Sequence, residues 1–262
     1  MGAGEEMQSK PIVVYINFGE VLWYLRYAKE DWPVHGEKAV LDYIGSIFRY
    51  LDEFNLPVTR RAARELETLR DKLAKTKSGY TLTSDEASAL STIMKDLEKT
   101  LIAEARGNVA FIVTDKRIDV NKLLHKIPSL MAPDAFDSLP DIAKYDFIEA
   151  GKCIAFELPT AAAFHLLRGT EAVLRHFYCS IVKRGRVEIL WGPMVEHLRK
   201  RKTPPPRPLV DNLDNIRRSF RNPTQHPEKI YDIQEVQDLF GLCTDAVNRM
   251  CAVMIKTASK KS

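Results

Sequence analysis

The chain has 262 residues, 45% of them hydrophobic, and a formal net charge of +4 at pH 7. This length lies between one large domain and two ordinary ones, and the apolar content suffices for a packed core. The longest apolar runs are too short to span a bilayer, and residues 1–10 lack the apolar core of an export signal. We therefore expect a cytoplasmic protein with no membrane partner.

Residue spacing also excludes several kinds of site. No cluster of His, Cys or acidic residues has metal-ligand spacing, and no glycine-rich phosphate-binding motif stands at a strand–helix turn, so we expect neither a metal nor a cofactor. The four cysteines lie in apolar stretches without CxxC spacing, and we expect them to be reduced, buried and inert. They are Cys153, Cys179, Cys243 and Cys251.

The first half of the chain is predicted to be mostly helical. Residues 12–16 and 109–113 are short apolar runs that look like strands and could pair as a minimal two-stranded sheet. Breaks fall at residues 57–59 and 83–85, where Thr83 or Ser84 can cap a helix. Three stripes with three-to-four spacing indicate helices: Val40-Ile44-Phe48-Leu51, Leu66-Leu69-Leu73 and Leu90-Ile93-Leu97-Leu101.

Pro133 and Pro140 interrupt this pattern, and we expect a domain boundary between them. The predicted fold class is all-α. A mostly helical N-terminal domain of unknown role would occupy residues 1–139, and a helical bundle residues 140–256. A basic, disordered tail would follow at residues 257–262.

The second half predicts a bundle of five helices. The first three are expected at about 141–156, 161–182 and 193–202. A fourth carries the stripe Leu209-Leu213-Ile216-Phe220 and should end near Asn222, because Pro223 follows. The fifth opens with the capping box Asp232-Ile233-Gln234-Glu235. Its core face is Ile233, Val236, Phe240, Cys243, Val247, Met250 and Met254.

Positive charge is concentrated late in the chain. Residues 181–221 hold eleven Lys or Arg against four Asp or Glu. One interpretation is a solvated helix end followed by a proline-rich connector. The other is a footprint for a polyanion, since phosphate contacts dominate nucleic-acid affinity. The residues expected to bind RNA are Arg199, Lys200, Arg201, Lys202, Arg217 and Arg218.

An arginine and a histidine follow this basic stretch at one chain reversal, in Arg221-Asn222-Pro223-Thr224-Gln225-His226. Arginine presents a planar fork suited to phosphate oxygens, and histidine exchanges protons near neutrality. A phosphate-binding cation and an acid–base group are the minimum needed to cleave RNA through its own 2′-hydroxyl, without a metal.

The predicted helix at 161–182 carries an unusual polar line. Arg168, Glu171 and Arg175 share a narrow sector of an otherwise apolar helix, with His165 at its edge. Either this is an exposed face with a Glu171–Arg175 ion pair, or Glu171 points toward the later loop and orients Arg221 or His226.

Taken together, these segments resemble HEPN (higher eukaryotes and prokaryotes nucleotide-binding) domains over about residues 140–256. The resemblance rests on Leu158-Pro159-Thr160-Ala161-Ala162-Ala163-Phe164-His165-Leu166-Leu167-Arg168-Gly169-Thr170-Glu171, on Glu171-x(3)-Arg175 and on the Arg221–His226 element. HEPN domains are α-helical bundles whose Arg-x(4–6)-His element forms the active site of metal-independent endoribonucleases. Many are toxins of toxin–antitoxin pairs or effectors of anti-phage defence.

The resemblance implies roles for particular residues. Arg221 and His226 would be the reacting pair, with Asn222 binding phosphate or fixing the loop. Products would carry a 2′,3′-cyclic phosphate and a 5′-hydroxyl. Because one loop supplies one histidine, we expect a homodimer with a composite site; His165 and His176 are alternatives for the second proton carrier. A cognate antitoxin or defence-system protein is a further expected partner. The alternative is a non-catalytic module that binds RNA, a nucleotide or a protein.

Overall fold

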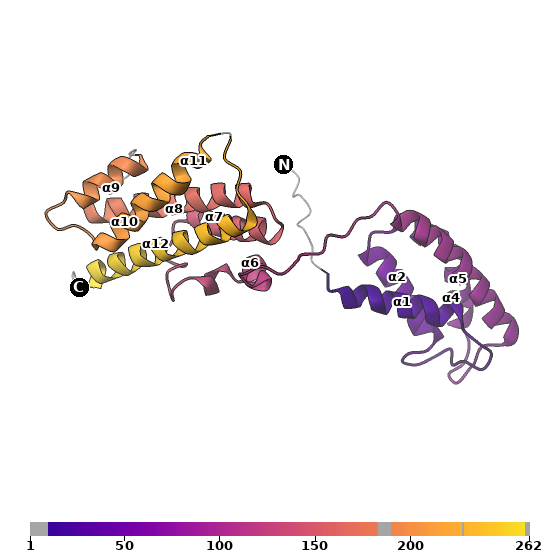
Figure 1. Cartoon of the computed structure of the whole chain (residues 1–262). Coiled ribbons are helices and arrows are strands. Elements are labelled where there is room, and N and C mark those ends of the chain that lie inside the picture. The colour runs from indigo at the N-terminus through magenta and orange to yellow at the C-terminus, as the bar shows by residue number, and fades with distance from the viewer. Residues whose placement is uncertain (1–9, 183–189, 227, 260–262) are drawn as a thin grey trace. The chain divides into compact units, whose positions relative to one another are not determined.

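A computed structural model of the chain describes residues 10–182, 190–226 and 228–259 (Figure 1). Over these ranges the fold is all-α, as predicted, and the only β pairing is an isolated bridge between Pro33 and Thr81. The chain divides into two compact units between Phe111 and Ile112. Each unit has its own hydrophobic core.

The first unit is a helical bundle in which the three predicted stripes form much of the core. Thr83 caps the longest helix with a complete capping box: its hydroxyl accepts the Glu86 N–H, and the Glu86 side chain accepts the Thr83 N–H. The helices of this unit are α1 (Ile12–Arg26), α2 (Val40–Glu53), α3 (Pro57–Ala62), α4 (Arg64–Leu73) and α5 (Ser84–Ala105).

Three predictions for this region were wrong. Residues 12–16 begin helix α1 instead of forming a strand, because the longer segment buries Phe18, Val21 and Leu25 at helical spacing. Residues 109–113 form no regular secondary structure and pair with no strand, so the expected two-stranded sheet is not found among the described residues. Pro57 also starts a short helix where a break was expected, since a proline fits the first helical turn.

The division between the units lies earlier than the expected boundary at 139/140. Residues 112–139 include α6 (Val120–His125) and a 3₁₀ turn (Ile127–Leu130). Leu123 and Ile127 are buried in the core of the second unit. The two prolines that suggested the boundary therefore lie within this unit, where they interrupt regular structure without separating two cores.

The five helices predicted for the second unit are all present, and the observed ends of most of them differ from the predicted ends by only a few residues. Helix α12 begins directly after the predicted capping box, whose Asp232 carboxylate accepts the N–H groups of Gln234 and Glu235. It continues to Ser259, so residues 257–259 are helical and not a disordered tail; 260–262 lie outside the described residues. The helices are α7 (Asp141–Ala155), α8 (Pro159–Val182), α9 (Trp191–Arg199), α10 (Arg207–Ile216), α11 (Asn222–Thr224) and α12 (Ile233–Ser259).

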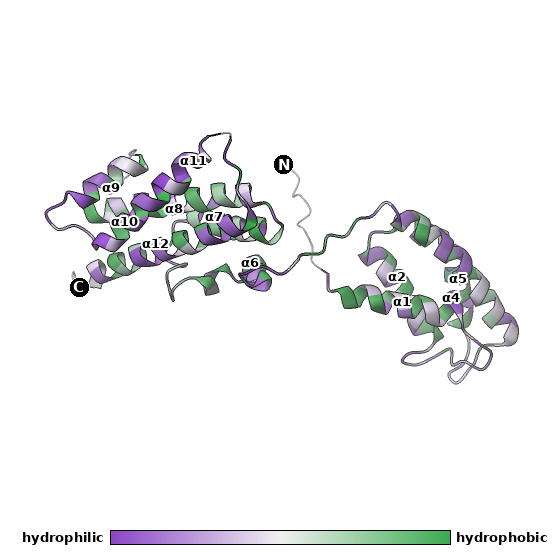
Figure 2. Cartoon of the chain, viewed as in Figure 1, coloured by the Kyte–Doolittle hydropathy of each residue, from purple (hydrophilic) through white to green (hydrophobic). Residues whose placement is uncertain are grey.

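Helix α8 is central to this unit and packs chiefly against α7 and α12 (Figure 1). Hydrophobic and hydrophilic residues alternate along these helices (Figure 2), as helices with one buried face require. The approach of α7 to α8 depends on Gly169, because a Cβ there would lie 3.0 Å from the Asp146 Cβ. Long, rigid and buried on several sides, α8 is a firm base for the side chains on its remaining face.

The cysteines match the prediction in part. Cys243 and Cys251 are buried, and burial raises the pKa of the Cys243 thiol to about 12, which makes it unreactive. Cys153 and Cys179 are only partly buried. In the part of the chain that the structure describes, no helix is both long and apolar enough to cross a membrane.

Candidate functional site

A π-helical turn leads into the Arg/His element. It spans Arg217–Arg221, directly after α10, and its last hydrogen bond runs from the Asn222 N–H to the Arg217 carbonyl, five residues back. The expectation that the helix ends near Asn222 was wrong, since α11 continues through Pro223 to Thr224. The wider turn accommodates a proline that has no N–H to donate.

Two hydroxyl groups complete the hydrogen bonding at this turn. The Phe220 carbonyl accepts from the Thr224 hydroxyl at 2.6 Å and from the Tyr231 hydroxyl at 3.2 Å. Tyr231 is buried, and burial raises the pKa of its phenol, so this hydroxyl keeps its proton. Its backbone N–H also reaches the Thr160 hydroxyl at 3.3 Å. Both ends of the loop are therefore anchored, in part by Tyr231, which the sequence did not single out.

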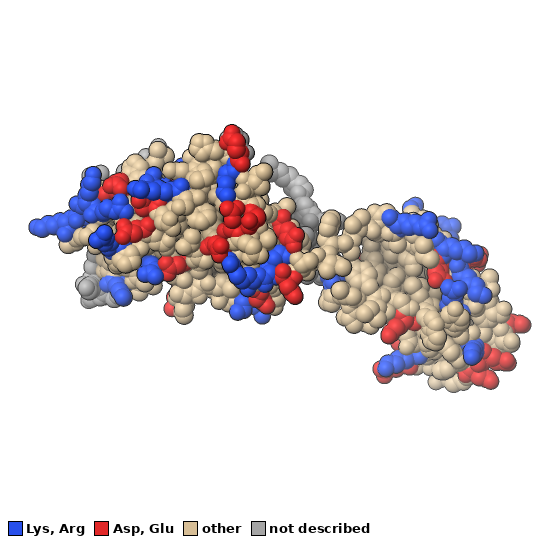
Figure 3. All heavy atoms as spheres, viewed as in Figure 1, with Lys and Arg blue, Asp and Glu red and all other residues tan. Residues whose placement is uncertain are grey.

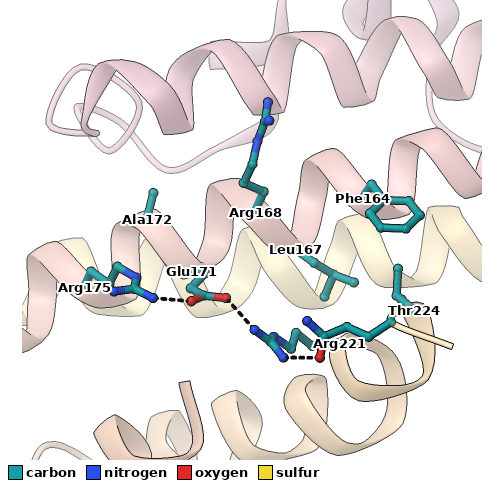
Figure 4. A pocket seen from close by; sticks show the side chains of 9 residues that line it. Phe164, Leu167, Arg168, Glu171, Ala172, Arg175, Arg221 and Thr224 are labelled. Atoms are coloured by element: carbon teal, nitrogen blue, oxygen red, sulfur yellow. Dashed lines mark hydrogen bonds and ion pairs between the residues drawn. The ribbon is translucent and has the colours of Figure 1, made fainter. Parts of the chain in front are cut away.

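Glu171 of α8 joins two arginines from different elements (Figure 4). One carboxylate oxygen accepts from Arg175 Nη2 at 2.7 Å, and the other lies 3.4 Å from Arg221 Nη2. The sequence left open whether Glu171 pairs with Arg175 or points toward the loop, and the structure contains both contacts. Arg221 Nη1 also donates to Gln225 Oε1 at 2.6 Å, so Arg221 is held from both sides.

These side chains border a hollow with a volume of about 340 Å³. Figure 4 shows Glu171 between the two guanidinium groups, with the apolar side chains of Phe164 and Leu167 farther along α8. One side of the hollow is thus charged and the other is apolar. The lining residues are Phe164, Leu167, Arg168, Glu171, Ala172, Arg175, Arg221, Thr224 and Gln225.

A fully buried carboxylate explains the rest of the polar line on α8. Asp146 of α7 accepts from His165 Nδ1 at 2.8 Å and from Arg168 Nη2 at 2.6 Å. This pairing offsets the cost of burying the acid. Helical spacing in the sequence could have indicated that Asp146 is buried, since it lies three residues after Ala143 on the buried face of α7. His165 is therefore a partner of Asp146 and does not line the hollow.

The histidine of the Arg/His element lies apart from the hollow. His226 is exposed on the turn that follows α11, where its backbone N–H donates to the Pro223 carbonyl at 2.9 Å. Asn222 is also exposed, and neither residue belongs to the hollow's lining. His176 is exposed on α8 and likewise outside the lining. The structure brings together Arg221, Glu171 and Arg175, and leaves His226 free to face outward.

Three of the expected RNA-binding residues converge on one acid. Asp214, 8% exposed, lies 2.8 Å from Arg217 and 2.9 Å from Arg218, with Arg199 at 3.7 Å. Burial alone would raise the pKa of this carboxyl, but the hydrogen bond from Arg217 and the surrounding positive charges hold it below its ordinary value. Part of the positive charge in this stretch is therefore neutralised within the fold.

The remaining basic residues lie at the end of α9. Lys200 and Lys202 are exposed and Arg201 is half-buried. In Figure 3, Lys and Arg gather at the end of the second unit where α9 is joined to α10. None of the six expected RNA-binding residues lines the hollow. Lys183, Arg184 and Arg186, which contributed to the charge surplus, lie outside the described residues.

Comparisons with protein-family models, curated proteins and solved structures find no match to this chain. Across residues 10–182, 190–226 and 228–259, no three His, Cys, Asp or Glu side chains are grouped so as to hold a metal ion.

Proposed function

We propose that the second unit is a HEPN-type, metal-independent endoribonuclease whose reacting groups are Arg221 and His226. The supporting observation is the contact between Glu171 and Arg221 at the edge of a hollow. An arginine held from two sides presents its remaining N–H groups in a fixed orientation, which favours recognition of a phosphate. We place the protein among the toxins of toxin–antitoxin pairs and the effectors of anti-phage defence, acting in the cytoplasm.

The proposed reaction is an intramolecular transesterification, in which the phosphorus of one RNA linkage is transferred from the 5′-oxygen to the neighbouring 2′-oxygen. His226 removes the proton of a ribose 2′-hydroxyl, and the 2′-oxygen forms a bond to phosphorus. The bond from phosphorus to the 5′-oxygen breaks, and that oxygen takes a proton from a second, protonated imidazole. The products are a 2′,3′-cyclic phosphate and a 5′-hydroxyl. The nucleophile comes from the RNA itself, so this chemistry requires no metal.

Each residue has a separate role in this scheme. Arg221 neutralises the charge that grows on the non-bridging phosphate oxygens. Asn222 donates a hydrogen bond to phosphate. Glu171, with Arg175 on its other oxygen, is a positioning residue that holds the guanidinium of Arg221 in place.

The second imidazole would come from a second copy of the chain. His226 is exposed and stands outside the hollow of its own chain, so a twofold axis beside this turn can bring two histidines to one phosphate. The active species is then a homodimer. A neutralising antitoxin or a defence-system protein could inhibit it by covering the same face.

Incubation of the purified protein with total RNA in EDTA, followed by mapping of the product ends, tests the assignment. We expect cleavage with cyclic-phosphate and 5′-hydroxyl ends. Cleavage that requires a divalent metal, or that leaves 5′-phosphate ends, would contradict this mechanism. Light scattering at the assay concentration tests the shared site, which a monomer with full specific activity would refute.

A non-catalytic RNA- or nucleotide-binding module is the second candidate, and the position of His226 outside the hollow favours it. Arg221 would bind phosphate in the same way in such a module. RNA binding without any cleavage in the same assay would support this alternative.

A further inference from the structure

The hollow contains an apolar part that the proposed reaction does not use. Phe164 is 55% exposed and lines it together with the buried Leu167. A single exposed aromatic residue is ordinary on a protein surface. This ring is distinctive because it borders the same hollow as Arg221, Glu171 and Arg175.

The spacing along α8 defines a short track. Phe164 and Glu171 are seven residues apart on one face, which is two helical turns or about 10 Å along the axis. The volume of about 340 Å³ is near the lower end of the range for ligand pockets. The hollow therefore has an aromatic ring at one end, cations at the other and space for one small planar group.

We propose that the hollow takes one unpaired base of single-stranded RNA, stacked on Phe164 above Leu167, while the adjoining phosphate binds Arg221. This inference rests on the proposed function and names its substrate class. Gln225 contributes to base recognition: its Oε1 is occupied by Arg221, so its amide N–H groups remain to donate to an acceptor on the base edge.

A duplex cannot use this arrangement, because its bases are stacked on one another and paired. Sequence-tolerant binding of single strands commonly depends on bases that stack on aromatic side chains beside a basic track. The hollow combines these two elements on one rigid helix. Single-stranded RNA should therefore bind more tightly than duplex RNA of the same length.

Photocrosslinking provides a direct test with a readout that is independent of cleavage. The protein carrying His226→Ala is irradiated with a short single-stranded RNA that contains one 5-iodouridine, and the crosslinked residue is located by mass spectrometry. We expect the crosslink at Phe164. In the same background, Phe164→Ala should weaken single-strand affinity about tenfold, the order of one lost base–aromatic stack, and Phe164→Trp should retain it.

Ile142→Ala is the matched control, because Ile142 is 48% exposed on α7 and lies outside the lining of the hollow. It should leave affinity unchanged. Equal affinity of the wild-type and Phe164→Ala proteins, a crosslink elsewhere, or equal binding of duplex and single strand would overturn the base pocket. If the wild-type protein still cleaved RNA in EDTA, those results would overturn the base pocket alone and leave the proposed ribonuclease function in place. A wild-type protein that neither binds nor cuts RNA would refute both proposals.

Discussion

Two carboxylates in the second unit each gather arginines, but with different outcomes. Asp214 is buried beneath Arg199, Arg217 and Arg218, and the whole group lies outside the hollow. Glu171 holds Arg175 and Arg221, and all three of these residues line the hollow. Arginine density therefore does not locate a site by itself. A carboxylate that fixes a guanidinium beside open space is more informative than one that neutralises several within the fold.

Replacement of Arg221 should have the largest effect on cleavage. Arg221→Ala should lower kcat at least about 100-fold, as removal of one donor to a developing charge typically does. Arg221→Lys should also be poor, because a point charge cannot replace the planar fork. The measurement is initial rate on a fixed RNA in EDTA, with thermal melting to confirm folding.

Arg249→Ala is the control for Arg221→Ala. Arg249 is an exposed arginine of α12 that pairs with Asp245, away from the hollow. We expect its rate to equal that of the wild type. If both arginine variants lose the same fraction of activity, the effect is one of overall charge and the site assignment fails.

The two carboxylates can be compared by matched amide substitutions. Glu171→Gln should lower activity about tenfold while costing only about 1 kcal/mol of unfolding free energy, because Glu171 makes one short contact, to Arg175, and a longer one of 3.4 Å to Arg221. Asp214→Asn should instead cost about 2 kcal/mol of unfolding free energy, since it removes hydrogen bonds between charged partners, and should leave kcat nearly unchanged. Cleavage rates and urea unfolding of both variants test this comparison. If Glu171→Gln lost stability but kept its activity, Glu171 would be a structural residue and not a positioning residue.

Charge reversal at the end of α9 should have a smaller effect, confined to binding. Lys200→Glu and Lys202→Glu should weaken RNA affinity more than turnover, and each should reduce the salt dependence of binding by about one counterion. Arg217→Glu should do the same but also destabilise the fold, because Arg217 bonds to Asp214. Binding titrations at several salt concentrations test this, and a salt slope equal to that of the wild type would exclude the lysines from the interface.

The smallest expected effect is on stability in acid. The folded-state pKa of Asp214 is lowered, so its contribution is present above the ordinary pKa of an aspartate and is lost as pH falls through the folded value. The difference in unfolding free energy between wild type and Asp214→Asn should therefore shrink below about pH 4. A difference that stays constant from neutral to acid pH would contradict this.

Helical periodicity predicted most of the fold, and its failures have physical causes. Residues 12–16 contain no charged side chain and show no polar–apolar pattern, so the helical period became clear only with the burial of Phe18, Val21 and Leu25. The boundary was misplaced because prolines mark interrupted helices as well as linkers. Burial of Leu123 and Ile127 in the second core depends on contacts distant in sequence.

The candidate site could be predicted only in part. The spacing on α8 put Glu171 and Arg175 on one face, and the contact with Arg221 was one of two stated alternatives. The π-helical turn could not be predicted, because it depends on Pro223, which has no N–H to donate, and on the buried Tyr231, whose hydroxyl donates to the Phe220 carbonyl. Phe164 was noted only as part of a motif, since its exposure beside Arg221 is a property of the folded bundle.

The most direct test of the central claim compares two histidines. His226 is exposed at the Arg/His turn, and His125 is exposed at the end of α6, outside the hollow. On the same RNA in EDTA, His226→Ala should cut at least about 100-fold more slowly than the wild type, the scale of a lost acid–base group, while His125→Ala keeps the full rate. Equal cleavage by the wild-type and His226→Ala proteins would contradict the proposed ribonuclease site.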